Sequence, residues 1–538
     1  VLTCKPGTVG GRKDDHPANF CGKATLTRPA TYGAVGLPYN HLTHVAGYPG
    51  GEVGEYETKS DYNVNGIVQD FDRYTLEMTW DLSDNISLSS LTGSRDMYSR
   101  TYIDFGADEY GLFTRDRKRE NNFTSQEFKL QGTVGDRIDW VGGVYYWDYY
   151  QVIRHDSYSF VDFRDDPDTV GTVEGAHLLA ALAASGHKRP LSPGPKTAMD
   201  GFANTGLAWF GEVNFALGDK LDLSAGVRFN DEDHTAYGYT STGTKLNPAR
   251  PDVDMGGCVF CRTTKQTLPT TFESTTPRVA LSYSASDDVM VYGSYAEGFG
   301  AGGIAAIDIP GLPASMSYDP EETQSFELGL RGNFLDGRFR LFATMFSTNW
   351  DKIQVSETLK DPSNPGQNLP EAEITNAGTA SADGVEIEGR LLVSDALQLD
   401  FTVGMLDTAY TSLGQATQIK VGDTFRQAPE LTWSIGLQHD TALTNGGTFT
   451  TRLDYGFVDD YVRVRESQRQ TFQESYSKLN ARFNYEPPEG DWRLSVFGTN
   501  LTDERYLNGG FLSTGFAFDL ATVARPREVG ASLEFFFD

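Results

Sequence analysis

The sequence lacks any uninterrupted apolar stretch approaching the roughly 20 residues that a membrane-spanning helix needs. The longest helix-like run, from Ala176 to Ser185, has about half that length, and we expect it to form a short helix within a loop. Charged residues are also few, at 22% of the chain, whereas aromatic residues reach 12% and glycines number 57. This composition argues against a series of soluble domains, although a chain of 538 residues could hold three of them.

Positive charge is in short supply. The chain has 45 Lys and Arg residues against 74 Asp and Glu residues, which gives a formal net charge of −29. Because phosphate binding needs clustered Lys and Arg, nucleic acid is excluded as a partner. The acidity indicates solvated loops and turns, and an attraction for cationic ligands or divalent ions stays open as a second interpretation.

Cysteine is scarce, with four residues in two local groups: Cys4 with Cys21, and Cys258 with Cys261. Both groups lie in loop-like sequence, and we expect each pair to form a disulfide in a separate extracellular loop, as an oxidising compartment allows. The Cys258-Val-Phe-Cys261 unit could also be a redox site or half of a zinc site. A redox site would need a strand–helix context, which is absent here, and a zinc site would need a second pair nearby.

Catalytic motifs are missing as well. The sequence has no G-x-S-x-G and no H-E-x-x-H, so we expect neither an enzyme nor a cofactor. Its eight histidines are scattered singly, and His155, His187 and His234 lie in or near predicted loops. We expect them to be solvated, not to be haem or metal ligands. The acidic segment at 162–168 lacks the ligand spacing of an EF-hand and is interpreted as a loop, with adventitious calcium as the alternative.

The most informative segment that is present is the last one, E-V-G-A-S-L-E-F-F-F-D from Glu528 onwards. Apolar and polar residues alternate there with a period of two, which predicts a strand with one apolar and one polar face. A strand of this kind that ends in aromatic residues is typical of the closing strand of an outer-membrane barrel.

The same alternation occurs at Tyr74–Trp80 and in the segments around 221–230 and 478–485. We expect the apolar residues of these strands to face lipid and the charged residues to face the lumen. The residues predicted to face lipid are Leu221, Leu223, Val227, Val529, Leu533 and Phe535, and those predicted to face the lumen are Arg228, Arg482 and Glu534.

Short turns alternate strictly with long connections along the chain. Eight turns rich in Asp, Asn, Gly and Pro lie near 83–85, 135–136, 218–219, 286–288, 335–337, 394–395, 444–446 and 487–490. The connections between hairpins are longer, such as those at about 98–121, 151–204 and 231–271. This asymmetry predicts an all-β, antiparallel transmembrane β-barrel of about 17 strands within residues 70–538.

An odd number of strands has a topological consequence. The strand at 70–80 and the closing strand run in the same direction, so they cannot pair as antiparallel neighbours. We therefore expect residues 1–69 to be an extracellular loop region that follows N-terminal strands missing from this sequence.

Four segments carry a family resemblance. Tyr292–Phe299 looks like the strand that leads into a "Y-x-E-G-F-R-A-P" motif, with Gly300-Ala301-Gly302 in place of R-A-P. Pro320–Arg331 looks like "P-E-x-S…E-L-G-x-K", Asn500–Tyr506 looks like "N-L-x-D-x-x-Y", and Pro526-Arg527 looks like the entry to a closing strand. In their order and spacing, the four segments resemble the TonB-dependent outer-membrane receptor family over about residues 70–537.

The resemblance implies a complete barrel of 22 strands with an N-terminal plug and a TonB box, neither of which is visible in this sequence. It implies a receptor in the outer membrane of a Gram-negative bacterium that imports a scarce nutrient, a ferric siderophore or a similar large solute. The implied partners are TonB with ExbB and ExbD, through the plug, together with outer-membrane lipid and lipopolysaccharide. The alternative is a plugless channel or a structural barrel subunit of a larger outer-membrane assembly, in which a surface lipoprotein is a further partner. The residues that would contact a ligand are not indicated.

Overall fold

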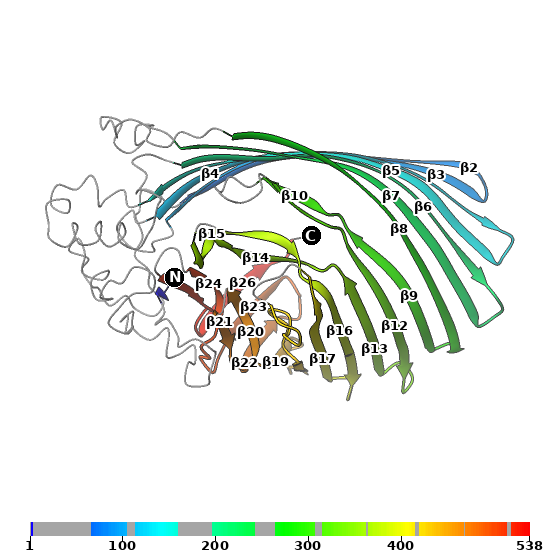
Figure 1. Cartoon of the computed structure of the whole chain (residues 1–538). Coiled ribbons are helices and arrows are strands. Elements are labelled where there is room, and N and C mark those ends of the chain that lie inside the picture. Colours follow the sequence, from blue (N-terminus) through cyan, green and yellow to red (C-terminus); the bar gives the residue numbers. More distant parts are fainter. Residues whose placement is uncertain are drawn as a thin grey trace, which may run out of the picture.

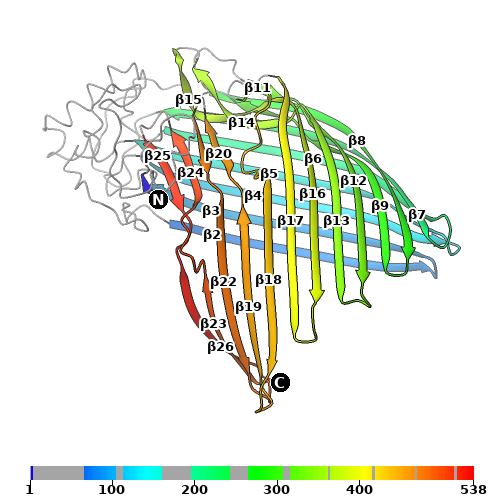
Figure 2. The same ribbon diagram turned by 90° about the horizontal axis from the view of Figure 1, so that it is seen from below.

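The computed structural model describes residues 2–3, 66–104, 113–159, 196–242, 264–306, 315–361, 364–414, 419–466, 469–513 and 518–537. The described part is built from β-strands (Figures 1 and 2). Among these residues no helix is long and apolar enough to cross a membrane.

Seventeen strands form one antiparallel, barrel-type sheet. They are β2 (Gly66–Ser83), β3 (Ile86–Asp104), β4 (Phe113–Val134), β5 (Ile138–Ser159), β6 (Lys196–Ala216), β7 (Leu221–Thr242), β8 (Thr264–Ser286), β9 (Val289–Gly300), β12 (Glu321–Phe334), β13 (Phe339–Asp351), β16 (Gly378–Leu392), β17 (Leu397–Leu413), β18 (Leu431–Ala442), β19 (Thr448–Val458), β22 (Tyr476–Glu486), β23 (Trp492–Thr499) and β26 (Glu528–Phe535). The fold class and the strand number predicted from the sequence are thereby confirmed.

Smaller hairpins rise from the ends of the strands that are opposite the short turns. They pair β10 (Gly303–Ala306) with β11 (Ser315–Tyr318), β14 (Gln354–Asp361) with β15 (Asn364–Asn376), and β20 (Tyr461–Glu466) with β21 (Arg469–Gln473). The last hairpin, β24 (Leu507–Ser513) with β25 (Phe518–Val523), also pairs with β1 (Leu2–Thr3). The sequence predicted plain loops at these places, so part of each long connection is structured.

The order of the strands follows the chain. Each described pairing in the large sheet joins strands that are consecutive in the wall, from β2–β3 through to β23–β26. In the described part of the chain, β2 pairs only with β3, and β26 pairs only with β23. In Figure 1 these two strands lie on opposite sides of the curved sheet.

Short turns close the hairpins where the sequence predicted them. Gly135 (φ 60°) lies in the β4–β5 turn, and Gly446 (φ 87°) lies in the β18–β19 turn. A backbone with positive φ favours glycine because a side chain would clash there. The Leu335-Asp336-Gly337 turn has positive φ at all three residues, including the non-glycine residues Leu335 (55°) and Asp336 (53°).

The register of the strands separates two faces across the wall. On the apolar face, Leu223 pairs with Leu281, and the row continues through Gly293, Leu328 and Met345. Pairings from β13 onwards carry this face to Leu494 and Leu533 on the last two strands. The predicted grouping is confirmed: the six residues expected to face lipid share the apolar face, and Arg228, Arg482 and Glu534 share the polar face.

Several strands are longer than the sequence predicted. β4 begins at Phe113, although a connection was expected as far as 121, and β2 begins at Gly66, not at 70. Polar residues occupy both faces in these extensions; Asp231 and Asp233, for example, follow Phe229 on the apolar side of β7. Without an apolar residue at every second position, the pattern that identifies a half-buried strand is lost.

Candidate functional site: a polar wall and its ion-pair network

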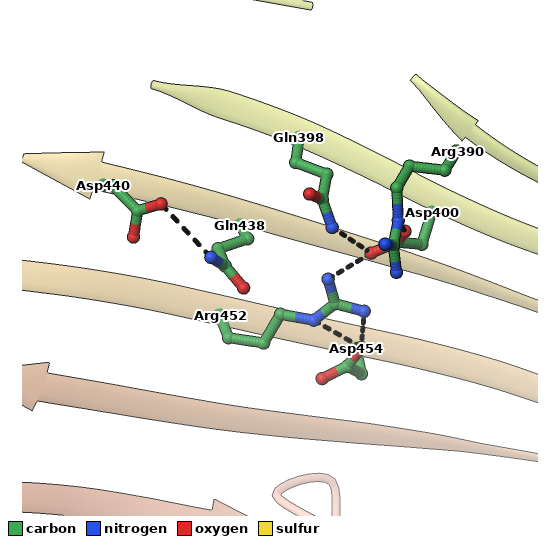
Figure 3. Close-up of polar contacts among 7 residues, drawn as sticks. All are labelled: Arg390, Gln398, Asp400, Gln438, Asp440, Arg452 and Asp454. Carbon is green, nitrogen blue, oxygen red and sulfur yellow. Dashed lines mark hydrogen bonds and ion pairs between the residues drawn. The ribbon is translucent and has the colours of Figure 1, made fainter. Parts of the chain in front are cut away.

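The polar face is the side of the sheet on which charged side chains gather. Its largest described network lies on β16–β19, where Asp400 is the centre (Figure 3). Arg390 donates from Nε to Oδ1 of Asp400 at 2.7 Å, and Arg452 donates from Nη1 to Oδ2 at 2.5 Å. The amide of Gln398 donates to the same carboxylate at 2.9 Å.

Arg452 extends the network to the next strand position. Its Nη2 lies 2.7 Å from Oδ1 of Asp454, and Nε donates to the same oxygen at 2.9 Å. Gly436 lies between Asp400 and Asp454 in the strand pairing, and a Cβ at this position would overlap the guanidinium of Arg452. Because two arginines and two aspartates neutralise one another here, the network leaves little unpaired charge for a ligand.

A second set of polar contacts continues along the wall to the last strands. Arg482 donates to Asn484 and to the fully buried Ser495, both at 3.0 Å. Arg493 donates to Glu486 at 2.5 Å and lies 3.6 Å from Glu534. Charges that are spaced along one face at every second residue suit a water-filled or plugged lumen and would be costly against lipid.

The apolar face carries a shallow groove of about 1190 Å³. Apolar side chains line most of it, among them Leu281, Leu328, Met345 and Met405, and Asp383 and Asp407 lie at one end. Leu328, Met345 and Met405 are more than half exposed. An apolar concavity on this face suits acyl chains of the membrane, so we do not assign it as the site of a soluble ligand.

Residues in or next to two of the motifs singled out in the sequence, Tyr292–Phe299 and Pro320–Arg331, form hydrogen bonds between connections. Glu321 accepts a hydrogen bond from the backbone N–H of Gln354 at 2.8 Å, and the amide of Gln354 donates to the carbonyl of Ala301 at 2.9 Å. Asn376 donates to the carbonyls of Asp319 and Lys352. These bonds join the connection between β9 and β12 to the connection between β13 and β16, at the rim opposite the short turns.

An ion pair supports the same rim. Nζ of Lys352 lies 3.1 Å from Oδ2 of Asp319, and both side chains are exposed. This hydrogen bond raises the pKa of Lys352 above its usual value. The raised pKa extends the charged form of the lysine, and with it the ion pair, to a higher pH than an isolated lysine would allow.

Only some of the predictions for individual residues fall on the part of the chain that the structure describes. Cys4, Cys21, Cys258 and Cys261 lie outside the described residues, as do the helix-like run at 176–185, the acidic segment at 162–168 and the side chains of His155 and His187. The expectation that His234 is a solvated loop residue is wrong. It lies on β7, its Nε2 is 2.9 Å from Glu232, and its ring contacts Phe272 at a centroid distance of 5.2 Å.

No cluster of three or more His, Cys, Asp or Glu that could hold a metal ion occurs among the described residues. The network around Asp400 was not predicted from the sequence. Arg390, Asp400 and Arg452 each stand at an alternate position of a predicted strand, which was an available signal. Their contact depends on strand pairing between distant parts of the chain, because Asp400 and Arg452 are 52 residues apart in the sequence.

Comparison with known proteins identifies the family to which this architecture belongs. A family model described as "TonB dependent receptor-like, beta-barrel" matches residues 15–501. The chain is 23% identical over 332 residues to the pesticin receptor of Yersinia pestis, an alignment that covers 61% of this chain and 44% of that receptor. It is 26% identical over 305 residues to the metal-pseudopaline receptor CntO of Pseudomonas aeruginosa, covering 54% of this chain and 36% of that receptor.

Solved structures share the fold. The ferric yersiniabactin uptake receptor FyuA from Yersinia pestis superposes with a TM-score of 0.67 at 18% identity, over 88% of this chain and 62% of that chain. The siderophore receptor PiuA from Acinetobacter baumannii gives a TM-score of 0.60 at 16% identity, over 90% and 66% of the two chains. The chain spans less than half the length of the pesticin receptor and of CntO. From the family match we conclude that the chain belongs to the TonB-dependent receptor-like β-barrel family, whose members are integral outer-membrane transport receptors of Gram-negative bacteria and not enzymes.

Proposed function

We propose that this chain forms most of the barrel wall of a receptor that imports a scarce metal chelate, such as a ferric siderophore, across the outer membrane. The continuous polar face of the 17-stranded sheet is the observation that carries the proposal. A barrel of about eight strands is filled by its own side chains, whereas a much larger one encloses a channel or a plugged lumen. The relatives include a metal-pseudopaline receptor and a ferric yersiniabactin uptake receptor, which favours a metal chelate as the cargo.

The two edge strands support a further part of the proposal. β2 and β26 are the first and the seventeenth strands of an antiparallel meander, so they run in the same direction. An unpaired edge is costly in lipid because its N–H and C=O groups have no partners. We therefore propose that further strands, about five as in a 22-stranded barrel, stand between them, and that residues 1–69 form an extracellular connection into β2. A plug inside the completed barrel would couple it to TonB, ExbB and ExbD.

Uptake of radioactive iron tests the proposed function. We expect cells that lack this gene to lose uptake of at least one ferric chelate from a panel, and the full-length gene to restore it. The restored uptake should disappear in a tonB deletion and after collapse of the proton gradient. Uptake that continues unchanged without TonB would contradict the proposal and favour the plugless channel. A gene deletion that affects no chelate in the panel would contradict the assignment of the cargo.

A further inference from the structure

A second group of side chains on the polar face differs from the network around Asp400. It lies on β3–β6, in the half of these strands that is distant from the short turns. One row across the strands holds Arg95, Phe123, Tyr149 and Asn204. The second row holds Met97, Asn121, Gln151 and Phe202. The third row holds Ser99, Arg119 and Ile153. We call these residues the arginine–aromatic patch.

Hydrogen bonds fix the centre of the patch. Nη2 of Arg95 donates to Oδ1 of Asn121 at 2.9 Å, and Nδ2 of Asn121 donates to the hydroxyl of Tyr149 at 2.7 Å. The Tyr149 hydroxyl then donates to Oε1 of Gln151 at 2.9 Å. Asn121 is only 4% exposed, and the Arg95 guanidinium lies 5.7 Å from the centre of the Phe123 ring. A positive charge and aromatic rings are thus held in place before any ligand arrives.

The cationic groups of the patch are incompletely satisfied. Among the described residues, Nε of Arg95 and Nε of Arg119 are buried and have no hydrogen-bond partner. The third row continues to Asp200 on β6, whose side chain lies outside the described residues, and the side chains described in the three rows include no carboxylate. On the adjacent strand β7, the carboxylate of Glu232 is already bonded to His234. Arg452, in contrast, contacts both Asp400 and Asp454.

Leaving a buried N–H of a charged group unpaired is costly, so such groups normally have a partner. A bound anion would supply it. We infer that the arginine–aromatic patch is a binding surface for an anionic chelate that carries aromatic rings, through catecholate or phenolate oxygens. Guanidinium groups bind such oxygens with charge-assisted hydrogen bonds and also stack on planar rings, and Phe123, Tyr149 and Phe202 offer further ring contacts.

The inference deepens the proposed function and rests on it for the biological role of the ligand, but the binding step is tested separately. The full-length receptor is purified in detergent and titrated with a ferric tris(catecholate) complex, with a neutral ferric trihydroxamate complex as a comparison probe. Quenching of tryptophan fluorescence gives the dissociation constants. The wild type should bind the anionic complex more tightly, and this affinity should fall as salt is raised.

The variants are Arg95→Gln, Arg119→Gln and the double substitution. We expect the double variant to bind the anionic complex at least about ten-fold more weakly, which corresponds to the loss of about 1.4 kcal/mol. Arg100→Gln is the matched control, because it removes the same charge from the opposite face of β3, next to Ser99. Arg119→Lys retains the charge and loses the planar fork, so we expect it to fall between wild type and Arg119→Gln. Heat-modifiable migration on gels verifies that each variant is folded.

The outcomes separate the two proposals. Equal affinity of the double variant and the wild type, or no preference of the wild type for the anionic complex, would overturn the inference even if TonB-dependent uptake is found. Loss of binding in the double variant but not in Arg100→Gln would support the inference even if the cells show no TonB-dependent uptake. If Arg100→Gln weakened binding as much as the double variant, the effect would be one of net charge, and the assignment to this patch would be wrong.

Discussion

Leu281→Arg should destabilise the folded receptor by roughly 2–4 kcal/mol, the cost of an arginine at the lipid-facing midplane of a barrel. Leu281 is 45% exposed on the apolar face and pairs with Leu223 on one side and Gly293 on the other. It lies several residues from the turn between β8 and β9, near the middle of the apolar part of these strands. The free energy of unfolding is measured by guanidinium titration of the full-length protein in phospholipid vesicles.

Ser282→Arg provides the matched control. Ser282 is the next residue on β8, on the polar face, where it pairs with Asp222 and Tyr292. An arginine there meets water or a carboxylate, and we expect a change within about 0.5 kcal/mol, as for ordinary surface substitutions. If Ser282→Arg were the more damaging of the two, the faces would be reversed, and the register of the whole sheet would be wrong by one residue.

Asn500→Ala is expected to cost about 2–4 kcal/mol, since it leaves several buried backbone groups without partners. Asn500 is 5% exposed, and its Oδ1 accepts the backbone N–H of Glu504 at 2.8 Å. Its Nδ2 donates to the carbonyls of Glu504 and Arg525, at 2.9 Å and 3.3 Å. Its φ of 49° is left-handed, a conformation that asparagine tolerates better than alanine.

Thr502→Ala is the control for this substitution, because Thr502 is an exposed residue of the same turn. We expect Thr502→Ala to unfold at the guanidinium concentration of the wild type and Asn500→Ala to unfold at a clearly lower one. Protease digestion of membranes should also cut Asn500→Ala faster near β24–β26. Equal midpoints for the two variants would show that the Asn500 contacts do not tie the last strands together.

Much of the fold could be predicted from the sequence because two local signals coincide. A period of two across Leu221–Phe229 and Val529–Phe535 identifies strands with a single apolar face, and turn residues such as Gly135 and Gly446 mark where the chain reverses. Both signals depend only on neighbouring residues. They determine the number of strands and the orientation of each face, and the pairings in the structure agree.

The candidate sites were beyond such reasoning because they depend on strand register between distant residues. Arg95 meets Asn121, and Asn121 meets Tyr149, through two separate pairings. His234 was predicted as a loop residue because acidic and polar residues surround it. In the structure β7 continues past the apolar region, and His234 lies on the polar face of this strand. The motif residues Glu321 and Asn500 were quoted for the family resemblance, and their buried hydrogen bonds became visible only in three dimensions.

The most direct test of the central proposal, a wall in which further strands separate β2 from β26, is the distance between these two strands in the full-length protein. Spin labels at Met78→Cys and Ala531→Cys, both on the apolar face, allow pulsed electron resonance to measure it. With about five strands between them and about 4.8 Å per strand, we predict a separation of roughly 25–30 Å. Labels on directly neighbouring strands, about 4.8 Å apart, would instead give strong line broadening and no such separation, and this result would contradict the proposal.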